Sequence, residues 1–198
     1  MEKDENKEKY LLLNEMSFTI KALLDIYNNE KVSSDKIKKD IYKTIHTLLS
    51  PDKWGEKHAV SIMAREFAKE NKFTKELEKV SWDDLGNAKD EKKTTGNGKR
   101  GLILEHIVPR KYLMDWLFRC NCDQKTIKLI LEKTKCVVIH WEEDKRLRDY
   151  KLSSKRPNPA KAYYEIAQIK LEGLKKIDDI IKWVGFEDVS EFEKKIGI

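Results

Sequence analysis

The sequence predicts an α+β fold that is predominantly helical, with one small unit of two strands followed by a helix. Charged residues make up 38% of the 198-residue chain, and only eight glycines and four prolines interrupt it. This composition is typical of helices with solvated faces. Apolar residues recur at three- and four-residue spacing over most of the chain, and only two short apolar runs, beginning at Leu102 and Cys136, have the length and character of strands.

The first 85 residues are predicted to form a helical N-terminal layer. The helical spacing runs from Lys9 to Asn28, resumes after Ser34, which can cap a second helix, and covers a third segment from about Lys57 to Asn71. The stretch SPDKWG separates the second helix from the third. Residues 86–100 then read GNAKDEKKTTGNGKR, which is polar throughout and predicts a flexible loop.

Residues 101–198 are expected to complete one compact domain with the N-terminal layer. The two strands are predicted at Leu102 and at Cys136–His140, where the short β-branched run favours a strand over a helix. Helical patterns are found at Lys111–Phe118, Thr126–Lys133, from Glu142 onward, at Ala160–Leu174 and in a final stretch through Phe192.

Composition limits the classes of function. The net charge of +6 and pI near 9 favour a polyanionic partner, although a Lys-rich codon bias gives the same composition. Three cysteines without CxxC spacing argue against a disulfide framework or a four-thiolate zinc site. No run approaches 18 apolar residues, and the N-terminus lacks the apolar core of a signal peptide. We therefore expect a cytoplasmic protein with no membrane partner.

Two titratable clusters follow the predicted strands. In LILEHIVPRKYL, Glu105 and His106 end the first strand, and in CVVIHWEEDKRL the second strand ends at His140 and leads into acidic residues. We expect the strands to pair and to bring both clusters together. An imidazole can accept a proton from water near neutral pH, while carboxylates bind hard divalent cations. Hydrolysis of a phosphodiester uses both groups.

The run Glu105-His106-Ile107-Val108-Pro109 resembles the first motif of the HNH, or beta-beta-alpha-metal, endonucleases, and CVVIHWEEDKRL is similar to the second strand and helix of divergent, restriction-type members. The resemblance covers roughly residues 102–147. It implies a metal-dependent endonuclease that cleaves double-stranded DNA with Mg²⁺ or Mn²⁺. A type II restriction enzyme, acting as a homodimer on a palindromic site, is one form of this activity.

The resemblance also implies roles for individual residues. His106 would be the general base and Glu105 a metal ligand. Because no Asn or His follows Trp141 on the next helix, Glu143 or Asp144 would replace the family's helical ligand, with His140 as an additional candidate. Basic residues that flank both motifs would bind DNA phosphates, or else belong to solvated helix faces: Arg110, Lys111, Arg146, Arg148 and Arg156.

Two alternatives stay open. Glu143 and Lys145 form the ExK triplet of a PD-(D/E)xK nuclease, with Asp84 or Glu105 as a further ligand, but this triplet arises often by chance in a chain rich in Glu and Lys. A non-catalytic helical domain that binds DNA or protein is the other. Residues outside the motifs are interpreted as ordinary: His46 and His58 as helix residues, and the five tryptophans as core anchors.

Overall fold

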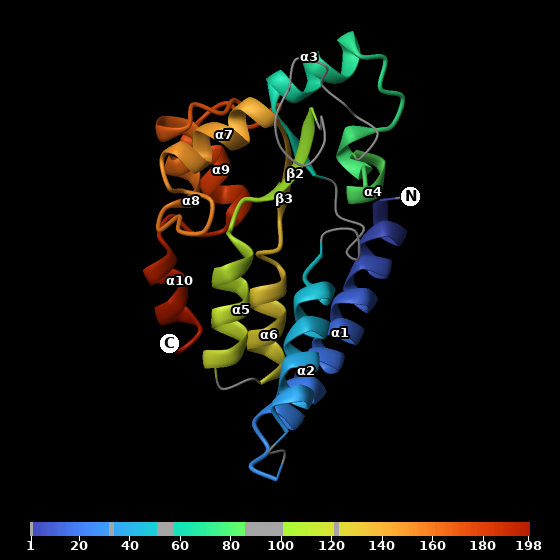
Figure 1. The fold of residues 1–198 in the computed structure, drawn as a ribbon, viewed down its shortest axis with the longest axis vertical. Helices are drawn as coiled ribbons and strands as arrows, with labels where there is room; N and C mark the ends of the chain where they lie inside the picture. Colours follow the sequence, from blue (N-terminus) through green and yellow to red (C-terminus); the bar gives the residue numbers. More distant parts are fainter. Residues whose placement is uncertain (1, 32–33, 51–57, 86–100, 121–122) are drawn as a thin grey trace.

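The computed structural model describes residues 2–31, 34–50, 58–85, 101–120 and 123–198, so the predicted loop at 86–100 lies outside the described residues. The predominantly helical α+β class is confirmed. Helices surround a small sheet, which lies near the centre of the molecule in Figure 1. Over the described residues, no helix combines the length and apolar character needed to cross a membrane.

Four helices run side by side below the sheet: α1 (Glu2–Tyr27), α2 (Asp35–Leu48), α5 (Arg110–Arg119) and α6 (Gln124–Leu131) (Figure 1). Helix α1 packs against α2 and α6, and α5 against α2 and α6. Their apolar stripes meet in one core that includes Ile20, Leu24, Ile41, Ile45, Leu113, Leu117 and Ile127. The three- and four-residue spacing of apolar residues in the sequence therefore reflects the packing of these helices against one another.

The sheet has one more strand than the sequence predicts. Strand β2 (Leu102–His106) pairs antiparallel with β3 (Cys136–His140), and β1 (Ala59–Val60) pairs parallel with β3, giving the order β1-β3-β2. The predicted third helix is correspondingly shorter: α3 (Ile62–Glu70) begins only after Ser61, whose side chain accepts a hydrogen bond from the Ala64 amide. A strand of two residues carries no periodicity, so only pairing reveals it.

The antiparallel register corrects our expectation that the two strand ends meet. Leu102 lies opposite His140, and His106 lies opposite Cys136. His140 and His106 therefore occupy opposite ends of the hairpin-like pair, roughly 13 Å apart along the strand direction. Any acid from the second motif reaches Glu105 only through the helix that follows β3.

That helix, α7 (Trp141–Asp149), starts directly at the end of β3 and packs back over both β2 and β3. The chain continues through α8 (Pro159–Lys161), a π-helical turn (Ala162–Ile166), α9 (Ile177–Val184) and α10 (Val189–Lys195). The predicted helix at Ala160–Leu174 is wrong beyond Ile166. Gln168 has a positive φ of 52°, and the segment after it pairs with β1, where the Glu172 amide donates to the Val60 carbonyl at 2.8 Å.

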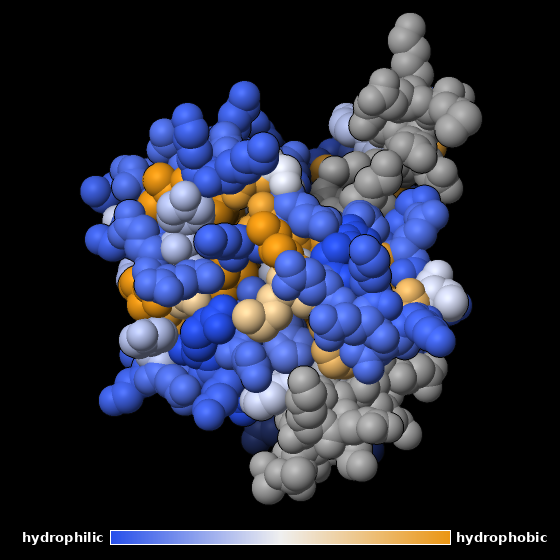
Figure 2. All heavy atoms as spheres, turned by 90° about the horizontal axis from the view of Figure 1, so that it is seen from above, coloured by the Kyte–Doolittle hydropathy of each residue, from blue (hydrophilic) through white to orange (hydrophobic). Residues whose placement is uncertain are grey.

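The two faces of the sheet are covered differently. One face carries Leu102, Leu104 and Val138, which pack with Val60 and Ala64 near α3, the 3-10 turn Leu77–Lys79 and α4 (Trp82–Leu85). The other face carries Val137 and Ile139 and belongs to the larger core with α7. Figure 2 looks onto the end of the molecule near α3 and α7, where hydrophilic side chains cover most of the face and apolar ones show only in scattered groups.

Candidate functional site

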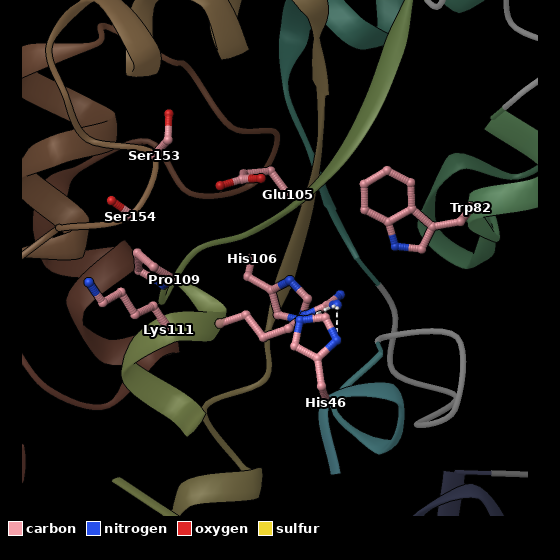
Figure 3. A pocket seen from close by; sticks show the side chains of 9 residues that line it. His46, Trp82, Glu105, His106, Pro109, Lys111, Ser153 and Ser154 are labelled. Carbon is pink, nitrogen blue, oxygen red and sulfur yellow. Dashed lines mark hydrogen bonds between the residues drawn. The ribbon is translucent and has the colours of Figure 1, made fainter. Parts of the chain in front are cut away.

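A pocket of about 360 Å³ opens where β2 ends. Glu105 and His106 line it from β2, and Pro109, Arg110 and Lys111 line it from the turn and the start of α5. Four of the residues that the sequence singled out, Glu105, His106, Arg110 and Lys111, therefore share one cavity. The rest of the lining comes from residues distant in sequence: His46, Trp82, Ser153 and Ser154 (Figure 3).

Glu105 and His106 reach this pocket from opposite faces of the sheet. Successive side chains of a strand point to opposite faces, so the two residues diverge. Figure 3 shows Glu105 pointing toward the loop with Ser153 and Ser154, whereas His106 points toward His46. Both line the same pocket because β2 is an edge strand and ends at His106. A ligand at the strand end can therefore contact both side chains.

His106 is held in a neutral state. Its side chain is 5% exposed, and Nε2 lies 3.1 Å from the carbonyl oxygen of Leu49. Because that carbonyl can only accept, Nε2 carries the proton and Nδ1 keeps its lone pair. Burial first, and then the charge of Arg110, lower the pKa of His106 to about 4. At neutral pH the residue is an imidazole with an acceptor nitrogen.

Glu105 is bound by a buried arginine. Arg156 is completely buried, and its guanidinium contacts the Glu105 carboxylate and donates to the carbonyls of His106 and Ile107. Its Nε donates to the Leu152 carbonyl at 2.6 Å. The prediction that Arg156 contacts DNA is therefore wrong for this conformation, because no part of the side chain reaches the surface. Arg156 instead stabilises the end of β2 from the interior of the protein.

Asp144 is the acid of the second motif whose charge acts on Glu105. Burial raises the pKa of Glu105, the Arg156 charge opposes this effect, and the Asp144 charge adds to the rise, which places Asp144 within electrostatic reach. Asp144 also pairs with Arg148 at 3.1 Å through Oδ2. In the described part of the chain, Oε2 of Glu105 accepts no hydrogen bond. Two carboxylates with water and a substrate phosphate are a common Mg²⁺ environment.

The described residues form no group of three or more His, Cys, Asp or Glu side chains placed to hold a metal. A divalent cation near Glu105 would therefore depend on the two predicted carboxylates, Glu105 and Asp144, as its protein ligands. Solvent and substrate oxygens would complete the shell, as is usual for Mg²⁺ at phosphoryl sites.

Glu143 and His140 do not join them. Glu143 is 2% exposed. Its carboxylate accepts hydrogen bonds from the Ser61 hydroxyl and, at 2.9 Å, from the His140 amide, and the second of these caps the N-terminus of α7. Burial raises the pKa of Glu143, and the hydrogen bond from Ser61 opposes this rise. His140 packs against Phe67 with ring centroids 5.0 Å apart. Both residues serve the junction of β3 and α7 rather than the pocket.

The ExK triplet is split by the same geometry. Glu143 is buried, whereas Lys145 is exposed two positions further along α7. Residues two apart on a helix do not face one another. The carboxylate that this alternative needs is also engaged by Ser61 and the His140 amide. Glu143 and Lys145 therefore do not face one another on α7.

The other four predicted DNA-binding residues divide into two sets. Arg110 and Lys111 line the pocket where α5 begins. Arg146 donates to the Ala167 carbonyl at 2.8 Å, and Arg148 is paired with Asp144, so these two stabilise the surroundings of α7. Only the first set shares a cavity with Glu105 and His106 among the described residues.

Sequence reasoning missed His46 and Trp82 as lining residues. His46 lies on the exposed side of α2, in its last turn, and Trp82 is the first residue of α4. Both line the pocket, but neither belongs to one of the two sequence motifs. His46 contacts Arg110 across 64 positions of sequence. No local pattern signals such a contact, although an imidazole on the exposed face of an amphipathic helix is the kind of residue that can reach a neighbouring element.

Comparisons with protein-family models, with curated proteins and with solved structures found no match to this chain.

Proposed function

We propose that the protein is a divalent-metal-dependent endonuclease that hydrolyses phosphodiester bonds of double-stranded DNA. One observation carries the proposal. An acid and a neutral imidazole at the end of an edge strand open into the same pocket as Arg110 and Lys111. This combination joins a proton acceptor to groups that attract a phosphate.

Each residue has a role in this proposal. Nδ1 of His106 accepts the proton of the attacking water. Arg110 and Lys111 bind the phosphate, assisted by the positive end of α5, whose preceding residue, Pro109, caps none of its amides with a side chain. Glu105 and Asp144 hold the cation. When bound, Mg²⁺ or Mn²⁺ offsets charge on the scissile phosphate and acidifies its coordinated water.

The local architecture supports this assignment. Strands β2 and β3 are antiparallel, and α7 packs back across both. This is the strand, strand and helix order that the resemblance to HNH endonucleases implies, with α5 and α6 inserted between the strands. As a type II restriction enzyme the protein would act as a homodimer, which presents two such pockets to the two strands of a palindromic site.

A non-catalytic nucleic-acid-binding module is the second candidate. The observation that favours it is the contact between Arg156 and Glu105, which satisfies part of the carboxylate without any metal. In such a binding module, Arg110 and Lys111 bind the phosphate backbone, and His106 serves only to hydrogen-bond the Leu49 carbonyl. The two functions differ in one measurable respect, since the binding module retains DNA but leaves it intact.

Neutralising Asp144 tests the metal site. Asp144→Asn should lower the rate of Mg²⁺-dependent plasmid cleavage on the order of 10²-fold, because metal ligation contributes several kcal/mol to such reactions. Cleavage by the variant should also require more Mg²⁺ for half-maximal rate. The measurement is conversion of supercoiled plasmid to nicked and linear forms over a range of Mg²⁺ and Mn²⁺ concentrations.

Glu142→Gln is the matched control, because Glu142 is exposed in the same first turn of α7. It removes the same charge from the same helix and should leave both the rate and the Mg²⁺ requirement unchanged. Equal losses in the two variants would show that the acidity of the helix start matters in general and that Asp144 is not a metal ligand.

A further inference from the structure

His46 brings a second imidazole to the pocket from outside the two motifs. It lies on α2, in the N-terminal helical layer, and lines the cavity together with His106 (Figure 3). The two rings are close enough that His46 contributes to the lowered pKa of His106. The proposed nuclease mechanism assigns a proton acceptor but no group that protonates the leaving oxygen.

The contact between His46 and Arg110 leaves the edge of the imidazole accessible. Nη1 of Arg110 lies 3.3 Å from both Nδ1 and Nε2 of His46. An atom equidistant from both nitrogens in the ring plane would overlap Cε1, so Nη1 must lie over the ring face. Nη1 thus contacts the ring face, and the in-plane directions of both nitrogens find no other partner in the described part of the chain. Those directions are the ones used in proton transfer.

The two imidazoles differ in their exposure to solvent. His106 is buried, whereas His46 is exposed. Burial and then the Arg110 charge lower the pKa of His46, and the other charged groups at this cavity are Lys111 from α5 and Glu105 from β2. A phosphate bound at Arg110 cancels that positive charge and favours protonation of His46.

We propose that His46 is a second catalytic imidazole that protonates the leaving oxygen during phosphodiester hydrolysis. As the water oxygen bonds to phosphorus, its proton passes to Nδ1 of His106. The bond from phosphorus to the leaving oxygen breaks, its electron pair stays on that oxygen, and the oxygen takes a proton from the His46 imidazolium. Both rings then exchange protons with solvent. This step rests on the proposed function.

The test uses two substrates that differ in their need for an acid. Cleavage of plasmid DNA releases an alkoxide that must be protonated, whereas bis(p-nitrophenyl) phosphate releases a nitrophenolate that leaves without a proton. His46→Ala should lower kcat on plasmid on the order of 10²-fold, the lower range for general acid catalysis, and should change kcat on bis(p-nitrophenyl) phosphate by no more than about 3-fold.

Two further variants serve as controls for the effect of His46→Ala. His106→Ala removes the base and should lower the rate on both substrates. Thr47→Ala, at the exposed position next to His46 on α2, should change neither. Because His46 is exposed, its replacement should also leave the thermal melting midpoint within a few degrees of the wild type.

Three outcomes would overturn the proposal. His46→Ala that cleaves plasmid at the wild-type rate excludes any catalytic role. Equal losses on both substrates show that His46 binds or positions the phosphate and donates no proton to the leaving group. In both cases wild-type cleavage that depends on His106 leaves the proposed nuclease function intact. Wild-type protein that hydrolyses neither substrate overturns the nuclease function and the role of His46 together.

Discussion

Replacement of Arg156 by alanine is expected to lower the free energy of unfolding by about 3–5 kcal/mol, because it leaves a buried ion pair with one partner. The guanidinium is completely buried, contacts one oxygen of the Glu105 carboxylate and donates to the carbonyls of His106 and Ile107. Without it, three acceptors at the end of β2 lose their donor. Urea denaturation followed by circular dichroism measures the change.

The double variant Arg156→Met with Glu105→Gln provides the control. It removes both charges while keeping side chains of similar length, and replacing a buried ion pair as a whole costs much less than breaking it. We therefore expect the double variant to recover at least half of the stability lost in Arg156→Ala. A double variant as unstable as Arg156→Ala would show that the carbonyl contacts, and not the pairing with Glu105, account for the effect.

Acid destabilisation through His106 is the second large effect that we expect. The pKa is about 4 in the folded protein, against 6.5 for an ordinary histidine. Because the folded value is lowered, the unfolded chain binds the proton first. The contribution of His106 to stability is therefore complete above pH 6.5 and is lost as the pH falls toward 4, by about 3 kcal/mol in total.

His106→Gln removes the titration and keeps a side chain that can donate to the Leu49 carbonyl. The free energy of unfolding of this variant should vary less between pH 6.5 and 4 than that of the wild type, by about 3 kcal/mol over the whole interval. Urea titrations at half-unit steps of pH measure the difference. Parallel pH profiles for the two proteins would show that His106 titrates normally and is not held neutral by the fold.

Local patterns in the sequence predict much of this fold. The apolar stripes locate α1, α2, α5 and α6, since these helices bury one face in a shared core. The β-branched run locates β3, which is buried along its whole length because it is the central strand. Such elements are visible in sequence because their burial repeats with the period of the backbone.

Features that depend on the pairing of strands were not predictable from local sequence patterns. Strand β1 has two residues, and the segment after Gln168 leaves the helical path and donates a hydrogen bond to it from the Glu172 amide. The antiparallel direction of β2 and β3 leaves no trace in two short apolar runs. It separates His140 from Glu105 and makes α7 the element that returns an acid, Asp144, to the strand end.

The candidate site shows the same division. The adjacent pair Glu105 and His106 was evident from sequence, and the structure places both at one pocket. Arg156 resembles any surface arginine until its partner 51 positions away is known. His46 likewise contacts Arg110, on a different helix and 64 positions away. Residues whose function depends on a distant partner carry no signal in a single sequence.

Cleavage of supercoiled plasmid by the wild type and by two histidine variants tests the central claim most directly. His106 and His58 are matched: both are buried, and each places Nε2 3.1 Å from a main-chain carbonyl oxygen. With Mg²⁺ or Mn²⁺ we expect the wild type and His58→Ala to nick plasmid, and His106→Ala to be slower by 10²-fold or more, as expected for loss of a general base. No nicking by the wild type, or equal nicking by all three, would contradict it.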